Sequence, residues 1–141
     1  MKDKSFGVIP ILKDNNNYLF LLIRHTAGHW AFPKGHPKEG EIEIDTARRE
    51  FEEETGNKEY SLLDDISFVE NYTFTENNEL IEKTVKYFLA IVENLQISVK
   101  KEEIQDYRWL NFKESLKLIT FNESKGILIK VKRYLDGNIK S

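Results

Sequence analysis

The chain of 141 residues is about the size of one domain, and 40% hydrophobic with 32% charged residues is typical of folded proteins. A formal charge of −3 creates no overall attraction for nucleic acid or an anionic membrane, so we expect neither a stable nucleic-acid complex nor membrane association. The absence of cysteine excludes disulfides, thiolate metal sites and thiol nucleophiles. The N-terminal apolar stretches are too short for a signal peptide or a membrane span, so we expect one cytoplasmic domain over residues 1–141.

The first third of the chain alternates apolar runs with turn residues. Residues 6–12 and 18–24 are rich in β-branched and aromatic side chains, and the Asp and Asn residues between them tolerate left-handed turns, which predicts a β-hairpin. Residues 29–33 predict a short strand that ends at a proline. Over residues 44–55 the apolar period becomes helical, and Gly56 follows as a C-terminal stop.

Further strands and then two helices are predicted in the rest of the chain. Residues 66–75, 84–92 and 106–110 have the short apolar patterns of strands, while residues 113–119 and 123–135 have helical patterns. This order of strands, a helix, more strands and then helices indicates a layered α/β fold.

The predicted helix of residues 44–55 belongs to an acidic segment, residues 35–56, that holds seven glutamates and one aspartate. With Glu50 at zero, Glu53 falls at about 300° and Glu54 at about 40°, so the three carboxylates share an arc of roughly 100°. An apolar stripe beside them is expected to pack on the core, and it consists of Ile44, Ala47 and Phe51.

Two interpretations of these charges are open from the residues alone. Arg48 with Glu52, and Arg49 with Glu53, have the i,i+4 spacing of ion pairs on a solvated helix face. Glu50 and Glu54, in contrast, are like charges at i,i+4, and at about 6 Å they repel by roughly 3 kcal/mol at an effective dielectric near 20. A divalent cation would remove that cost, and carboxylate oxygens suit Mg²⁺ or Mn²⁺.

The spacing of the whole acidic segment is more specific than its charge. It resembles the Nudix box, the signature of hydrolases that act on a nucleoside diphosphate linked to another moiety. Seven matching positions would recur by chance about once in 10⁸ starts or less often. They are Gly35, Glu41 after five residues, Arg49 and Glu50 after seven more, Glu53, Glu54 and Gly56. Asn57 departs from the family, which usually has an apolar residue there, so we expect different packing after the helix.

The resemblance implies a Nudix fold, an α/β/α sandwich around a mixed β-sheet, and metal-dependent hydrolysis. The implied metal ligands are Glu50, Glu53 and Glu54, with the Gly35 carbonyl as a further ligand, and one glutamate is expected to deprotonate or orient the attacking water. Arg49 is expected to orient the carboxylates, and Gly35 and Gly40 to shape the loop before the helix. Polyphosphate hydrolysis depends mainly on positioning and charge neutralisation, for which we expect more than one Mg²⁺ or Mn²⁺.

Three segments outside the box resemble the asymmetrical diadenosine tetraphosphate hydrolases, namely residues 28–36, 83–90 and 102–128. This resemblance implies that His29, Lys34 and Lys83 contact phosphates. It also implies an additional carboxylate near the metals at Glu103, with Glu102 as the alternative. For Lys83 alone, a solvated strand end is the ordinary interpretation.

The same resemblance implies that Tyr87 and Phe121 stack on an adenine, since aromatic faces bind bases at roughly 1–3 kcal/mol each. For both residues packing in the core is the alternative, because Tyr87 lies in an alternating strand and Phe121 precedes the last helix. Trp30 and Trp109 are interpreted as structural.

The implied reaction is attack of water on diadenosine tetraphosphate, which releases ATP and AMP. One alternative is another Nudix pyrophosphohydrolase, which trims 5′-triphosphorylated RNA or destroys damaged nucleoside triphosphates. An RNA enzyme would need an extended basic surface, whereas the lysines here are interspersed with acids except at residues 130–133. Another alternative is a sensor that binds a nucleotide without cleaving it, but such proteins commonly lose box carboxylates that this chain retains. The oligomeric state stays open.

Overall fold

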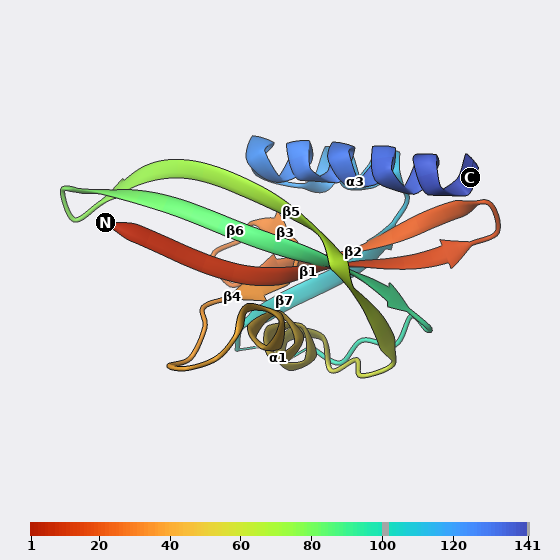
Figure 1. Ribbon diagram of the computed structural model, residues 1–141, viewed down its shortest axis with the longest axis horizontal. Coiled ribbons are helices and arrows are strands. Elements are labelled where there is room, and N and C mark those ends of the chain that lie inside the picture. Colours follow the sequence, from red (N-terminus) through yellow and green to blue (C-terminus); the bar gives the residue numbers. More distant parts are fainter. Residues whose placement is uncertain (100–101, 141) are drawn as a thin grey trace.

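The computed structural model describes residues 1–99 and 102–140 (Figure 1). Its strands are β1 (Lys2–Asp14), β2 (Asn17–His25), β3 (Trp30–Ala31), β4 (Lys34–Gly35), β5 (Tyr60–Glu76), β6 (Glu79–Val92) and β7 (Ile104–Leu110). Its helices are α1 (Glu43–Thr55), α2 (Phe112–Leu118) and α3 (Asn122–Lys140). The predicted element types and their order are confirmed, and each helix within the described residues is too short or too polar to cross a bilayer.

The strands form one mixed sheet of seven strands, in the order β3-β2-β1-β6-β5, with β4 paired to β1 and β7 paired to β2. The pair β1–β6 is parallel, and the other pairs are antiparallel. Along one edge β1 pairs with β6 from Lys2 to Ile11, while its other edge pairs first with β4 and then with β2. Because β4 pairs with β1, Gly35 lies opposite Phe6. The loop that follows β4 leads into α1.

Helices cover both faces of the sheet, with α1 on one side and α3 on the other (Figure 1). Alternation along β1 sorts its side chains between two cores, because successive residues of a strand point to opposite faces. Val8 packs with Ala47 and Phe51 of α1, which confirms the apolar stripe of that helix. Ile9 packs with Leu128 and other residues of α3. The layered α/β architecture is therefore confirmed.

The two long hairpins turn at asparagines in the left-handed conformation. Asn15 has φ 57° in the predicted β1–β2 turn, and Asn77 and Asn78 have φ 52° and 63° in the β5–β6 turn, as a two-residue hairpin turn requires. Strands β5 and β6 begin earlier than predicted, at Tyr60 and Glu79, because backbone pairing includes residues whose side chains give no apolar alternation. The pairing of β5 shifts its register between Leu63 and Ser67. The resulting hairpin projects beyond the helices (Figure 1).

The end of α1 explains the departure from the Nudix box at Asn57. Gly56 has φ 67° and closes the helix with a hydrogen bond from its N–H to the Glu52 carbonyl. The Asn57 side chain is buried, donates to Asn94 and to the Gln96 carbonyl, and accepts from a backbone N–H. A polar side chain is stable at this buried position because its amide is hydrogen-bonded to the loop after β6.

Candidate active site

The packing of α1 on β4 places its acidic face against a glycine. A Cβ atom at Gly35 would overlap the Glu50 carboxylate, so a side chain there would displace Glu50 or the strand. Strand β4 was missed in the sequence because two residues, Lys34 and Gly35, carry no periodicity. Their pairing with Phe6 and Gly7 holds this backbone beside the helix.

The guanidinium of Arg49 connects the carboxylates of α1 to the loop before it. Its Nε and one terminal nitrogen donate to Glu41 at 2.8 and 2.9 Å, while the other terminal nitrogen donates to Glu50 at 3.0 Å and Glu53 at 3.2 Å. It also donates to the His36 carbonyl at 2.9 Å. Hydrogen bonds from Arg49 lower the pKa of Glu41 to about 2, so that carboxylate stays ionised and the guanidinium stays in place.

The ion pair expected between Arg48 and Glu52 on α1 is absent from the part of the chain that the structure describes. Arg48 lies over the ring of Tyr60, 5.8 Å from its centroid, and the Tyr60 hydroxyl donates to Glu52 at 2.7 Å. The prediction of an Arg48–Glu52 pair is therefore wrong, because Tyr60 of β5 contacts both residues. The Arg49–Glu53 pair is present at 3.2 Å.

Glu50 and Glu54 line a hollow of about 380 Å³, hereafter the acidic hollow, together with Gly35, Lys34 and Glu103. Burial, and then the charges of Glu50 and Glu103, raise the pKa of Glu54 to about 9. One oxygen of Glu54 is buried and has no hydrogen-bond partner among the described residues. Burial also raises the pKa of Glu50. Two carboxylates that resist ionisation in this way are stabilised by a cation between them.

This donor set fits a hard divalent cation that keeps much of its hydration. Within residues 1–99 and 102–140, no three His, Asp or Glu side chains already converge on one cation position. Mg²⁺ usually binds through one or two carboxylates and completes its shell with water and substrate phosphates. The orphaned oxygen of Glu54, the adjacent Glu50 and the nearby Gly35 backbone fit that description.

Three histidines line the acidic hollow beside these carboxylates, and two of them, His25 and His29, contact each other. The rings of His25 and His29 stack with centroids 4.8 Å apart, and His29 in turn contacts Phe121 at 5.3 Å. Burial, and then the charges of His29 and Lys34, lower the pKa of His25 to about 4, so its ring is neutral at pH 7. His25 was not predicted from the sequence, because nothing distinguishes it there. Its place beside His29 depends on the turn in which the His25 N–H donates to the His29 carbonyl.

A second cavity of about 390 Å³, hereafter the aromatic cavity, adjoins the acidic hollow. Tyr72 and Phe74 of β5 lie on one strand face with Glu70, and Phe121 is half-exposed just before α3. The cavity shares two residues, His29 and Lys34, with the acidic hollow. Its complete lining is His29, Ala31, Lys34, Glu70, Tyr72, Phe74, Phe121, Glu123 and Ser124.

A model of the NUDIX domain matches residues 1–130 of the chain. The chain belongs to the Nudix hydrolase superfamily. The asymmetrical bis(5′-nucleosyl)-tetraphosphatase of Rattus norvegicus is 36% identical over 118 residues, which are 82% of this chain and 79% of that protein. The match to a family of enzymes confirms both the Nudix fold and the assignment to the hydrolases.

Two further proteins, one known from a crystal structure and one from its sequence, are similar to this chain. The crystal structure of a C. elegans Ap4A hydrolase binary complex superposes with a TM-score of 0.83 at 27% identity, over 95% of this chain and 98% of that one. The mRNA-decapping protein g5R of African swine fever virus is 32% identical over 139 residues, covering 87% of this chain and 54% of that protein. The chain thus spans about half of the viral protein.

Within this Nudix fold, the residues of the box do not all face the same space. Glu50, Glu54 and the Gly35 backbone meet at the acidic hollow, and Glu103, in the turn just before β7, joins them there. Glu53 is 41% exposed and bonded to Arg49, outside the lining of the hollow. Glu102 does not line the hollow, so the geometry favours Glu103 over its neighbour.

The expected stacking role of Tyr87 is incompatible with its position in the Nudix core. Its side chain is 0% exposed, its ring packs edge-on against Phe32 with centroids 5.8 Å apart, and its hydroxyl donates to Glu70 at 3.4 Å. No base can reach that ring, so this prediction is wrong. Tyr72, which the sequence analysis missed, presents an aromatic ring to the aromatic cavity instead.

Lys34 and Lys83, both expected to contact phosphates, lie in different surroundings. Lys34 lines both cavities, and burial followed by the charge of Lys83 lowers its pKa. Lys83 is 6% exposed, and its ammonium donates to Asp3 at 2.8 Å and Ser5 at 2.6 Å. The alternative interpretation of Lys83 as a solvated strand end is therefore wrong.

The two tryptophans contact neighbouring segments of the fold. The guanidinium groups of Arg24 and Arg108 are 5.9 and 5.4 Å from the centroid of the Trp30 ring. The indole N–H of Trp109 donates to the Leu95 carbonyl at 3.2 Å. Neither residue lines the acidic hollow or the aromatic cavity.

Proposed function

We propose that the protein hydrolyses diadenosine tetraphosphate to ATP and AMP in a reaction that requires Mg²⁺ or Mn²⁺. The observation that carries this proposal is that the aromatic cavity and the acidic hollow share His29 and Lys34. A nucleobase in the first would therefore lead its phosphate chain directly past the carboxylates of the second. The activity in the name of the rat relative supports the same substrate.

The base would bind against Tyr72 and Phe121, which both line the aromatic cavity. Phe121 is 50% exposed although it is a large apolar side chain, so its free face is available for stacking. Stacking on aromatic rings is worth roughly 1–3 kcal/mol for each base. Phe74 contributes further apolar surface to the same cavity.

The phosphate chain would lie between Lys34, His29 and the acidic hollow. Lys34 forms no side-chain hydrogen bond or ion pair within the described residues, and its buried ammonium therefore favours an anion beside it. Burial and the charge of Lys34 lower the pKa of His29, which favours a neutral ring that can donate one hydrogen bond.

Glu50 and Glu54, with the Gly35 carbonyl, Glu103 and Glu53, would hold the divalent cations. When bound, such cations neutralise phosphoryl charge and make water a better nucleophile near neutral pH. One of the glutamates would deprotonate or orient the attacking water, and Arg49 would hold Glu50 and Glu53 in place for that step. More than one ion is expected because the substrate carries four phosphates.

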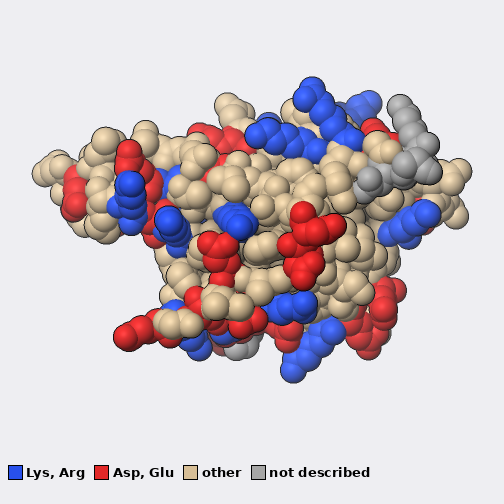
Figure 2. Space-filling model, in the orientation of Figure 1, with Lys and Arg blue, Asp and Glu red and all other residues tan. Residues whose placement is uncertain are grey.

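Neither alternative activity is favoured by a feature of the surface or of the box. On the face shown in Figure 2, Lys and Arg are interspersed with Asp and Glu, apart from a group of basic side chains over α3. A long RNA needs a continuous basic path, so a small nucleotide is the expected partner. All box carboxylates are present, which favours an enzyme over a sensor. We retain the expectation of a cytoplasmic location.

The test is a substrate panel with product analysis in saturating Mg²⁺. Diadenosine tetraphosphate, 8-oxo-dGTP, ADP-ribose and 5′-triphosphorylated RNA are compared, and ATP plus AMP from the first should form fastest. Glu54→Gln should lower kcat by at least about a hundredfold without unfolding the protein, because it removes charge at constant shape. Preferential turnover of triphosphorylated RNA, or a normal rate in the variant, would contradict the proposal.

A further inference from the structure

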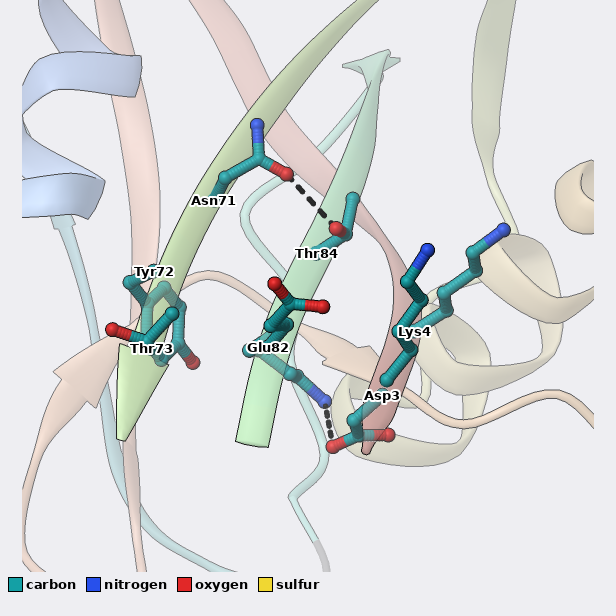
Figure 3. Close-up of a pocket in the computed structure, with 9 residues that line it drawn as sticks. Asp3, Lys4, Asn71, Tyr72, Thr73, Glu82 and Thr84 are labelled. Atoms are coloured by element: carbon teal, nitrogen blue, oxygen red, sulfur yellow. Dashed lines mark hydrogen bonds and ion pairs between the residues drawn. The ribbon is translucent and has the colours of Figure 1, made fainter. Parts of the chain in front are cut away.

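Asp3, near the N-terminus of β1, binds two cationic or donor groups at the edge of the acidic hollow. One carboxylate oxygen accepts from Lys83 at 2.8 Å, and the other contacts Nε2 of His36 at 2.9 Å. A dashed line in Figure 3 marks the ion pair between Lys83 and Asp3, and Asp3 lies beside Lys4 on β1. Asp3 lies outside the Nudix box and is 80 residues from Lys83 in the sequence.

The ammonium of Lys83 lies just behind the wall of the acidic hollow. Ser5 and His36 line the hollow, and the Lys83 nitrogen is 2.6 Å from the Ser5 hydroxyl and 3.3 Å from Nε2 of His36. Lys83 itself does not line the hollow. It is nevertheless near Lys34, since burial and then the charge of Lys83 lower the pKa of Lys34. Two ammonium groups thus flank the expected phosphate path, and Asp3 is bonded to one of them.

We propose that Asp3 is a built-in counter-ion, which competes with substrate phosphates for Lys83 and thereby selects against short phosphate chains. The inference rests on the proposed function, because that function identifies the phosphate chain that binds. In the free protein Asp3 stabilises a buried ammonium that would otherwise be unpaired. In the complex the phosphates must take over that ammonium or share it.

The competition depends on the charge that the ligand brings. A long polyphosphate with bound cations places several oxygens along the two lysines and can replace the Asp3 contact. A short chain such as that of AMP places few oxygens there, so it cannot displace the carboxylate of Asp3 from the Lys83 ammonium. Asp3 would therefore weaken the retention of short products more than the binding of the tetraphosphate.

The test measures binding of inorganic tripolyphosphate and of AMP by calorimetry in Mg²⁺ buffer, to the full chain and to Asp3→Asn. Asparagine keeps a hydrogen-bond acceptor for Lys83 but removes the charge, so AMP should bind roughly tenfold tighter, as for a single charge at partly screened distance, and tripolyphosphate should gain by a clearly smaller factor. Asp14→Asn removes the same charge from the exposed end of the same strand, and it should change neither constant appreciably.

A double-mutant cycle with Lys83→Met decides whether the effect passes through that lysine. Asp3→Asn should tighten binding in the natural background and have little effect when Lys83 is already methionine. Unchanged or weaker binding to Asp3→Asn, with an unfolding midpoint near that of the unmodified protein, would overturn the proposal and leave Asp3 a structural residue. An equal gain for AMP and tripolyphosphate would overturn the selection against short chains. Tighter binding that persists in the Lys83→Met background would also overturn it. Because binding needs no turnover, failure of the proposed hydrolysis would leave this result unaffected.

Discussion

Arg49 and Glu41 form a two-bond ion pair, with N···O distances of 2.8 and 2.9 Å, which joins the centre of α1 to the loop before it. The same carboxylate accepts from the Thr46 hydroxyl at 2.8 Å and from the Lys38 N–H at 3.0 Å. Glu41 therefore fixes the guanidinium that in turn contacts Glu50 and Glu53, although it does not line the acidic hollow.

Glu41→Gln should therefore reduce hydrolysis without removing a ligand. Loss of the paired charge releases Arg49, and the two glutamates that it holds lose their orientation, so kcat should fall roughly 10- to 100-fold. The measurement is steady-state hydrolysis of diadenosine tetraphosphate, with Glu39→Gln in the same exposed loop as the control. If both variants lose the same small amount of activity, the ion pair has no positioning role.

In the absence of divalent cations, the free energy of unfolding should fall as the pH rises. The pKa of Glu54 is raised to about 9, so its contribution to stability is fully present below its unfolded pKa of 4.5 and is lost as the pH rises towards 9. The loss at pH 7 should be about 3 kcal/mol. Urea unfolding in a chelator between pH 5 and pH 9 measures this slope, and Mg²⁺ should reduce it.

Glu54→Gln provides the matched variant for that pH dependence. A neutral amide cannot ionise, so in chelator the variant should be more stable than the natural protein at pH 8 and nearly equal to it at pH 5. Parallel slopes for the two proteins would show that Glu54 ionises normally in the fold.

Gly35→Ala should damage the acidic hollow while Gly126→Ala should not. The alanine Cβ would overlap the Glu50 carboxylate in the first case, whereas at Gly126 in α3 it would meet open space. The first variant should lose at least about tenfold in kcat and in Mg²⁺ affinity. The second should keep both and gain about 0.5–1 kcal/mol of stability. Normal Mg²⁺ affinity in Gly35→Ala would contradict the contact with Glu50.

Tyr72→Ala and Tyr87→Leu separate base stacking from core packing, because each removes an aromatic ring. Removing the Tyr72 ring from the aromatic cavity should raise KM by roughly 5- to 100-fold with a smaller effect on kcat, since stacking contributes roughly 1–3 kcal/mol. Tyr87→Leu replaces a fully buried ring and removes a hydroxyl that donates to Glu70, so it should lower stability and leave KM unchanged. Kinetics and thermal unfolding of both variants test this, and a raised KM for Tyr87→Leu alone would reverse the assignment.

The sequence by itself determined the acidic helix and its chemistry, because that information is local. A period of 3.6 residues places Glu50 and Glu54 on one face and Ala47 and Phe51 on the next, whatever the rest of the chain does. The spacing from Gly35 to Gly56 then identified the superfamily. The missing apolar residue at Asn57 was also visible in advance, although its hydrogen bonds to the loop after β6 were not.

Tertiary structure alone decided which aromatic and cationic side chains reach the site. Tyr72 and Tyr87 lie in strands of similar pattern, and alternation assigns each to a face without saying whether that point of the face is covered. The region around Tyr87 is filled by Phe32 and Glu70, whereas Tyr72 lies on the part of β5 that borders the aromatic cavity. Lys83 is likewise bonded to a residue 80 positions away through the parallel pairing of β1 and β6. Such contacts depend on the packing of distant segments, which no local pattern of residues encodes.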